Sequence, residues 1–395
     1  MANPTIYGNG TTTASNGANT IVHYYDRAGI KAANARNIYS QFCDRQSMPT
    51  NMGKTYKISK WQHIYDLAQD DVKFSAKGYL GKRDLATITT NLANTGMSGA
   101  ITEGAGAINK VTPKKITVET SIARYGFMIE YTDEVTLFSE DNVQVKYREE
   151  LGYLINQASE DLIQKDMLNG CGVVINAAGV AKNQLGTTIA PDGTNEDLYK
   201  VSFDLIRRAV KALVRNRAQR NSEMVTGSIK IGTAPINSAF YAIIGPEVKY
   251  DLETLTRNGG IAHEDWAYIP AYQYAFATNL AEGEVGSMHD VRFIESEGAM
   301  MEAGAGSAIP AGYTGTLSNN GTNFDVFPIL FPTKGAFATL GLKGIGKVVF
   351  NAKAPNEVEL GNPYGTKGFF SANMFYAGIA LQPEKLARVN VLATA

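Results

Sequence analysis

The hydrophobic pattern changes period once within residues 113–170, from the period of a strand to that of a helix. Apolar side chains occupy even positions over 116–122 and odd positions over 125–131, which predicts an extended strand with one phase slip. We expect a β-bulge at Ala123 and Arg124 to supply the slip.

A helical period follows this strand. From about residue 140 the apolar side chains recur every three or four residues, which predicts one long helix over about 140–169 with Gly170 as its C-cap. About thirty residues form a rod of about 45 Å, which suits a flat, extended subunit better than a sphere. The predicted buried stripe consists of Tyr147, Leu151, Leu154, Ile155, Ala158 and Leu162, of which Leu151, Leu154, Ile155 and Leu162 form the structural spine.

A long polar stretch separates the strand after Pro113 from an earlier one. Residues 54–61 (KTYKISKW) predict a strand in which Tyr56 and Ile58 face one way and the side chains between them the other, and we expect it to pair with the later strand. The roughly fifty residues between the two are rich in Gly, Thr and polar side chains, and a stretch of that kind is either functional or disordered. We interpret it as two extended arms that leave their own subunit, reaching about 50 Å at the rise of a strand. A small inserted subdomain is the alternative.

The first 53 residues are predicted to form an N-terminal arm. Residues 1–22 are rich in Thr, Asn, Gly and Ser and contain almost nothing to bury, so we expect them to be disordered or to be ordered by a partner. A helix over about 26–45 follows, with Ile38, Tyr39 and Phe42 as its anchoring face.

Residues 171–334 predict a mixed domain of helices and strands. Ser202 is placed to cap a helix with one apolar and one basic face. The apolar face contains Phe203, Leu205, Ile206, Ala209, Val210, Leu213 and Val214, and the basic face contains Arg207, Arg208, Lys211, Arg215 and Arg217. We favour a solvated surface for the basic face over nucleic-acid binding. Strand-like segments alternate with loops from Ser228 onward and return after residue 335.

Composition narrows the class of protein. With 395 residues and 44% apolar side chains, the chain has material for two or three domains. Its formal net charge of −1 excludes a global field that would attract nucleic acid or anionic membrane. Cys43 and Cys171 have neither CxxC spacing nor a signal peptide ahead of them, so we expect reduced thiols in a cytoplasm. No run of 18 apolar residues predicts a membrane span.

No motif predicts catalysis. The segment Gly341 to Val348 (GLKGIGKV) has the glycine spacing of a phosphate loop, but Val348 stands where Ser or Thr must hold magnesium and the segment leads into a strand. The four histidines are far apart in the sequence, outside any metal-ligand pattern. There is no GxSxG elbow. We therefore expect no enzyme activity, no cofactor and no metal site.

A set of stretches, in their order along the chain, carries a family resemblance. They are YDRAGIKAANARNIYSQF, GKTYKISKW, ITEGAGA, VETSIARYGFMIEYTDE, the long helix ending in DMLNG, AFYAIIGPEVKYDL and GEVGSMHDVRFIES. Together with the order of arm, excursion, strand, long helix, mixed domain and returning strands, they resemble the major capsid proteins of tailed bacteriophages with the Hong Kong 97 fold, and among these the N-four-type podophage capsid family. The resemblance covers nearly the whole chain from about Tyr24.

The resemblance implies an α+β subunit of the Hong Kong 97 type. Its parts are an N-terminal arm (1–53), an extended loop formed by a two-stranded β-hairpin (54–118), a peripheral domain with the spine helix (119–170 and 335–385) and an axial α/β domain (171–334). The resemblance leaves open whether residues 386–395 return to the axial domain. Such subunits form hexamers and pentamers in an icosahedral shell of the virion, assembled in the host bacterial cytoplasm. The shell encloses double-stranded DNA without sequence-specific binding and without a membrane. Portal and scaffolding proteins are the implied partners, with a cementing protein as a further candidate.

Position in the extended loop and in the later strand loop suggests which residues lie at subunit interfaces. They are Lys77, Tyr79, Lys82, Arg83, Glu103, Lys353, Asn356, Glu357 and Glu359. The cross-linking chemistry of the phage that names the fold is not carried over, because the lysines of the excursion lack its local context. The alternatives are an encapsulin-like compartment shell, another particle protein such as a tail component, and a soluble nucleotide-using enzyme.

Overall fold

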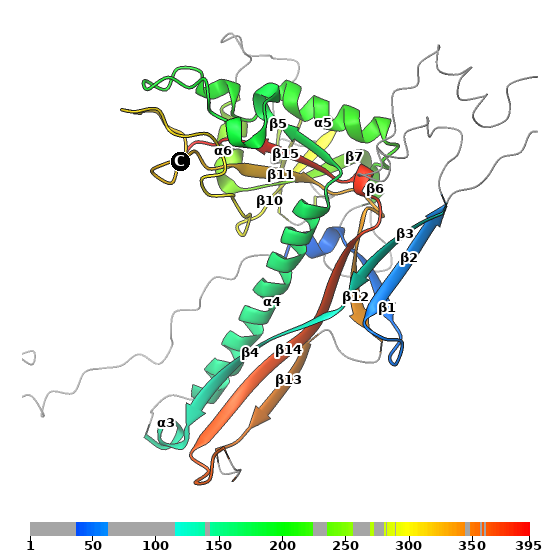
Figure 1. Cartoon of the computed structure of the whole chain (residues 1–395), viewed down its shortest axis with the longest axis vertical. Coiled ribbons are helices and arrows are strands. Elements are labelled where there is room, and N and C mark those ends of the chain that lie inside the picture. The colour runs from blue at the N-terminus through cyan, green and yellow to red at the C-terminus, as the bar shows by residue number, and fades with distance from the viewer. Residues whose placement is uncertain are drawn as a thin grey trace, which may run out of the picture.

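The protein has a broad unit and a narrow stem (Figure 1). A computed structural model describes residues 37–61, 115–138, 143–223, 235–255, 269–271, 280–281, 283–288, 290–343, 348–355, 358 and 361–395. The strands of the stem and of the hairpin beside it are β1 (Asp44–Met48), β2 (Thr55–Trp61), β3 (Lys115–Ser121), β4 (Ala123–Thr132), β12 (Phe337–Leu342), β13 (Val348–Lys353) and β14 (Lys367–Ala380), and the helices are η2 (Tyr39–Phe42), α3 (Asp133–Phe138) and α4 (Val143–Gly170).

The broad unit holds an eight-stranded mixed sheet. Its strands are β5 (Val173–Asn176), β6 (Asn221–Glu223), β7 (Pro235–Ile244), β8 (Ile269–Pro270), β9 (Glu284–Met288), β10 (Val291–Glu295), β11 (Phe327–Phe331) and β15 (Ala387–Val391), and its helices are η3 (Ala177–Gly179), η4 (Lys182–Gln184), η5 (Glu196–Leu198), α5 (Phe203–Arg215), α6 (Pro246–Glu253) and η9 (Pro383–Lys385). The order is β5-β15-β11-β7-β10-β9-β8, with β6 paired to β7.

Helix α5 confirms the predicted amphipathic helix. The Ser202 hydroxyl oxygen accepts a hydrogen bond from the Leu205 backbone N–H at 3.3 Å, so Ser202 is its N-cap. Leu205, Ile206, Ala209 and Leu213 are buried in the large core of the broad unit, while the predicted basic side chains are exposed. Val214, predicted on the apolar face, is half exposed instead.

The stem consists of α4 lying against a sheet in the order β1-β12-β14-β13, with β4 also paired to β14 (Figure 1). Leu151 and Ile155 share a buried cluster with Phe370, Ala372 and Met374 of β14. The 28 residues of α4 span about 42 Å, so the predicted long helix is confirmed in type and extent.

Two details predicted for α4 are wrong. Leu154 is 38% exposed, because the helix buries Ile163 and Met167 in a second cluster nearer the broad unit and its buried surface turns away from Leu154. Gly170 is still helical instead of capping the helix. A β-carbon at Gly170 would lie 3.0 Å from that of Ala380, so the missing side chain permits the close approach of α4 to β14.

The phase slip in the 113–131 pattern is not a bulge. Strands β3 and β4 are separated by Ile122 alone, and they belong to different sheets: β3 pairs antiparallel with β2, whereas β4 pairs antiparallel with β14. The β2–β3 pairing, with Ile58 opposite Val118, is the one predicted. The slip therefore marks a change of pairing partner.

The predicted helix over 26–45 is wrong where it can be tested, and its residues 26–36 lie outside the described part of the chain. Residues 39–42 form a single 3₁₀ turn, and Asp44 already begins β1, which pairs parallel with β12. Ile38 and Tyr39 are nevertheless buried in a cluster with α4, as anchors should be. Tertiary pairing with β12 thus overrides the local helix propensity.

Candidate assembly surfaces

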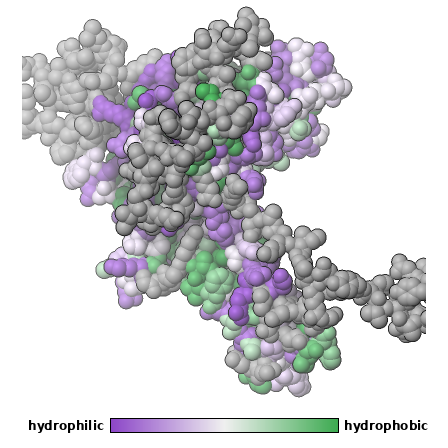
Figure 2. Space-filling model, turned by 180° about the vertical axis from the view of Figure 1, so that it is seen from behind, coloured by the Kyte–Doolittle hydropathy of each residue, from purple (hydrophilic) through white to green (hydrophobic). Residues whose placement is uncertain are grey.

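The tip of the stem exposes large apolar side chains from two neighbouring segments. Phe138, at the end of α3, is 85% exposed, and Tyr364, in the loop between β13 and β14, is 88% exposed. The Asp133 N–H donates to the Thr366 carbonyl at 2.9 Å, which holds α3 beside that loop. Figure 2 shows hydrophobic residues on the surface of the stem, including its lower end. Exposed apolar groups gathered in this way usually mark an interaction surface.

A second apolar surface flanks α4 along the stem. Ala372 of β14 lies between Phe127 of β4 and Phe350 of β13 in the register of the sheet. Ala372 is fully buried, whereas both phenylalanines are exposed. Helix α4 thus covers the middle strand and leaves an apolar residue in water on each side.

The β2–β3 hairpin starts at the stem and continues away from it (Figure 1). Tyr56 and Val118 pack against a cluster that contains Ala377 and Ile379. Further along the hairpin, the Lys60 ammonium lies 2.7 Å from a carboxylate oxygen of Glu384 in η9. At the last described pair the Trp61 ring is exposed, and the residues between Trp61 and Lys115 lie outside the described part of the chain.

Most of the residues predicted at interfaces lie outside the described residues, namely Lys77, Tyr79, Lys82, Arg83, Glu103, Asn356, Glu357 and Glu359. Lys353 is the last residue of β13, and its backbone oxygen accepts a hydrogen bond from the Tyr131 hydroxyl at 3.5 Å. It therefore belongs to the same end of the stem as the tip. The exposed Phe138 and Tyr364 were not predicted. Their only signal in the sequence is an aromatic residue beside a break or in a polar loop.

The described residues contain no group of three or more His, Cys, Asp or Glu side chains placed to hold a metal ion. Nor does any helix among the described elements combine the length and the apolar character that a membrane span requires. Val348 begins β13, so the glycine-rich segment leads into a strand as predicted, while its Gly346 and Lys347 lie outside the described residues.

Comparison with known proteins gives a consistent result. No protein-family model matches the chain. It is 29% identical over 402 aligned residues to the major capsid protein of Pseudomonas phage KPP21, covering 97% of this chain and 96% of that one. Among solved structures it resembles the capsid of Ralstonia phage GP4, with a TM-score of 0.56, 11% identity and 98% of each chain covered. The capsid structure of cyanophage P-SCSP1u matches with a TM-score of 0.54 and 12% identity, covering 96% of this chain and 95% of that chain.

The structural matches confirm the predicted fold, and the sequence match extends over almost the full length of both chains. The chain therefore has the Hong Kong 97-type fold of phage capsid proteins, and its sequence is similar along almost its whole length to that of a phage major capsid protein.

Proposed function

We propose that this chain is the major capsid protein of a tailed phage and that it assembles as hexamers and pentamers into an icosahedral shell around double-stranded DNA. The observation that carries the proposal is the match to a phage major capsid protein across 97% of this chain. Its function is structural, and its place is the capsid of the virion.

The shape of the subunit supports this role physically. A shell subunit must make several contacts at once, each of moderate size, because interfaces of about 1,600 Å² give specificity while assembly errors can still be corrected. The exposed tip, the two apolar edges beside α4 and the projecting hairpin are separate exposed parts of the subunit. We assign subunit contacts to all three, together with the predicted interface residues of the extended loop.

Charge supports a wall that encloses DNA without holding it. The chain has 37 basic and 38 acidic residues, so the net charge of a subunit neither attracts nor repels DNA strongly. A strongly basic wall would bind the packaged DNA through counterion release and hinder its movement. We expect portal and scaffolding proteins as partners in assembly, with a cementing protein as a further candidate.

The proposal is tested by electron microscopy of the purified chain, expressed alone and with scaffolding protein. Closed polyhedra or capsomers are expected. Tubes would instead indicate a tail component, enclosed protein cargo a compartment shell, and monomers that turn over nucleotide an enzyme. Each of these three results overturns the proposal.

Two variants test which surfaces drive assembly. Deletion of residues 73–95, which lie outside the described residues, is expected to leave a folded subunit that does not close shells. The double variant Phe138→Ser with Tyr364→Ser is expected to do the same, because both side chains are already in water in the free subunit. The control is the thermal unfolding of unassembled subunits, which should match the wild type. Normal particles from either variant would refute that surface's role.

A further inference from the structure

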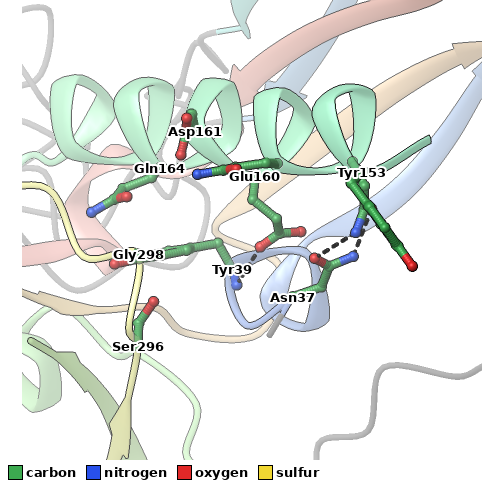
Figure 3. A pocket seen from close by; sticks show the side chains of 10 residues that line it. Asn37, Tyr39, Tyr153, Glu160, Asp161, Gln164, Ser296 and Gly298 are labelled. Carbon is green, nitrogen blue, oxygen red and sulfur yellow. Dashed lines mark hydrogen bonds between the residues drawn. The ribbon is translucent and has the colours of Figure 1, made fainter. Parts of the chain in front are cut away.

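A polar cavity lies where α4 passes η2 and the loop that follows β10 (Figure 3). Its inner volume is about 40 Å³, which is room for two or three waters or for one small cationic group. Side chains from one face of α4 line one wall, and the residues 37–39 segment and the loop at 296–298 line the other. The α4 residues are Tyr153, Asn156, Gln157, Glu160, Asp161 and Gln164.

Glu160 is the residue that indicates a ligand. It is 7% exposed, and its Oε2 accepts hydrogen bonds from the backbone N–H groups of Tyr39 at 2.9 Å and Ser40 at 3.3 Å. Its Oε1 is buried without a hydrogen-bond partner among the described residues. In Figure 3 the carboxylate extends from α4 into the space between the helix and η2. A buried carboxylate oxygen without a donor is costly.

The neighbouring polar groups are already paired with one another. The amides of Asn37 and Asn156 exchange two hydrogen bonds, at 2.7 Å and 3.0 Å. The Gln164 amide, oriented so that both ends are satisfied, donates to the Gly298 carbonyl at 3.1 Å and accepts from the Met300 N–H at 2.7 Å. The Glu160 Oε1 thus stands out as an acceptor that these neighbours leave unsatisfied.

The lining carries negative charge and no positive charge. Glu160 and Asp161 are its two acidic residues, and none of the ten lining residues is Lys, Arg or His. Burial raises the pKa of the Asp161 carboxyl above its ordinary value. The cavity therefore matches a cationic ligand in charge.

We propose that this cavity binds one organic cation, an ammonium or guanidinium group, through Glu160 Oε1. A charge-assisted hydrogen bond from such a group would satisfy the buried oxygen. A divalent metal fits less well, because calcium and magnesium require about six oxygen ligands and no three acidic or histidine side chains are grouped for it among the described residues. The bound cation would join α4 to η2 and to the loop after β10.

The cation has two sources of the same chemistry: a free alkylamine, or a Lys or Arg side chain of this chain or of a second copy. A density map of the assembled shell, or of the crystallised subunit, distinguishes them. Density beside Glu160 that is continuous with a backbone identifies a side chain, and isolated density larger than water identifies a free amine. Density no larger than ordered water overturns the proposal.

A solution experiment on unassembled subunits tests the site without relying on shell formation. Thermal unfolding is measured in putrescine and in sodium chloride of equal ionic strength, for the wild type, Glu160→Gln and Glu149→Gln. Glu160→Gln keeps an acceptor for the two N–H groups but loses the charge, whereas Glu149 lies on the same helix with its side chain in water.

For a free amine, putrescine raises the wild-type midpoint, and its apparent affinity is about 10- to 100-fold weaker in Glu160→Gln. For a bound side chain of the same subunit, putrescine has no specific effect, but Glu160→Gln lowers the midpoint and Glu149→Gln does not. A side chain of a second copy is absent from unassembled subunits and is identified from the map of the assembled shell. The proposal is overturned by a Glu160→Gln subunit whose midpoint equals that of the wild type under every condition, together with a map of the assembled shell that shows nothing larger than ordered water beside Glu160.

Discussion

Leu151 and Leu154 offer a matched test of how α4 is buried. Both leucines lie within α4, three residues apart, so replacement by Ala removes the same atoms and changes helix propensity equally. They differ in surroundings: Leu151 is 0% exposed beside β14, whereas Leu154 is 38% exposed. Any difference in stability between the two variants therefore reports packing against the sheet.

The expected magnitudes follow from this burial. Leu151→Ala should cost about 3 kcal/mol, because a fully buried Leu→Ala change loses transfer free energy and leaves a cavity. Leu154→Ala should cost about 1 kcal/mol or less, because a side chain partly in water leaves no cavity. A difference of about 2 kcal/mol corresponds to roughly a 30-fold change in the opening equilibrium.

The assay is hydrogen exchange of peptides from α4 in unassembled subunits, read by mass spectrometry. Local exchange is preferable to a global midpoint because a chain with two units need not unfold in one step. Urea unfolding followed by circular dichroism is the second measurement. Equal loss of protection in both variants, or a greater loss in Leu154→Ala, would refute the packing described for the stem.

Two further predictions concern close contacts and buried polar groups. Gly172→Ala should destabilise the subunit, because a β-carbon there would lie 2.4 Å from the Pro383 carbonyl oxygen. Gly152→Ala in α4 meets nothing within 4 Å and should instead stabilise the subunit by up to about 1 kcal/mol. Thermal unfolding of both variants checks this, and stabilisation by Gly172→Ala would contradict it. Tyr376→Phe should cost about 1–3 kcal/mol at pH 7, because the Tyr376 hydroxyl donates to Asp166 Oδ2 at 2.9 Å. Burial, with Asp166 beside it, raises the pKa of Tyr376 above its ordinary value of 10.0, so the folded state holds this proton more tightly and the stabilisation is complete below pH 10 and decreases as the pH rises further. Urea unfolding at pH 7 and at about pH 10.5 should therefore show the difference between the variant and the wild type shrinking, and a constant or growing difference would argue against the assignment.

Sequence periodicity predicted the elements whose side chains repeat over many residues. The long helix, the capped helix after Ser202 and the pairing of KTYKISKW with the strand after Pro113 all agree with the structure. The phase slip was located correctly but misinterpreted, because a period of two shows where a strand changes face and not which neighbour it pairs with. Only the contacts of β3 and β4 reveal two sheets.

The candidate surfaces and the cavity were harder to predict. One apolar stripe on α4 does not explain its burial, because the helix contacts two clusters and a polar cavity at different levels. The polar side chains at 156, 157, 160, 161 and 164 recur at helical spacing, which by itself indicates a face in water. Nothing in the sequence therefore indicates that Glu160 and Gln164 of this face are buried. The aromatic residues at the tip have no such regularity, since a single exposed Phe138 or Tyr364 is indistinguishable in sequence from a core residue.

The position of β15 in the broad unit affects when this protein can fold during synthesis. β15 lies between β5 and β11, and all five of its residues are buried. Its neighbour β5 is translated more than 200 residues earlier, which at about 5–20 residues per second is a delay of roughly 10–40 seconds. During that interval β5 and β11 lack the strand that lies between them in the finished sheet. The sheet of the broad unit can therefore be completed only after β15 has been translated, however early its other strands leave the ribosome.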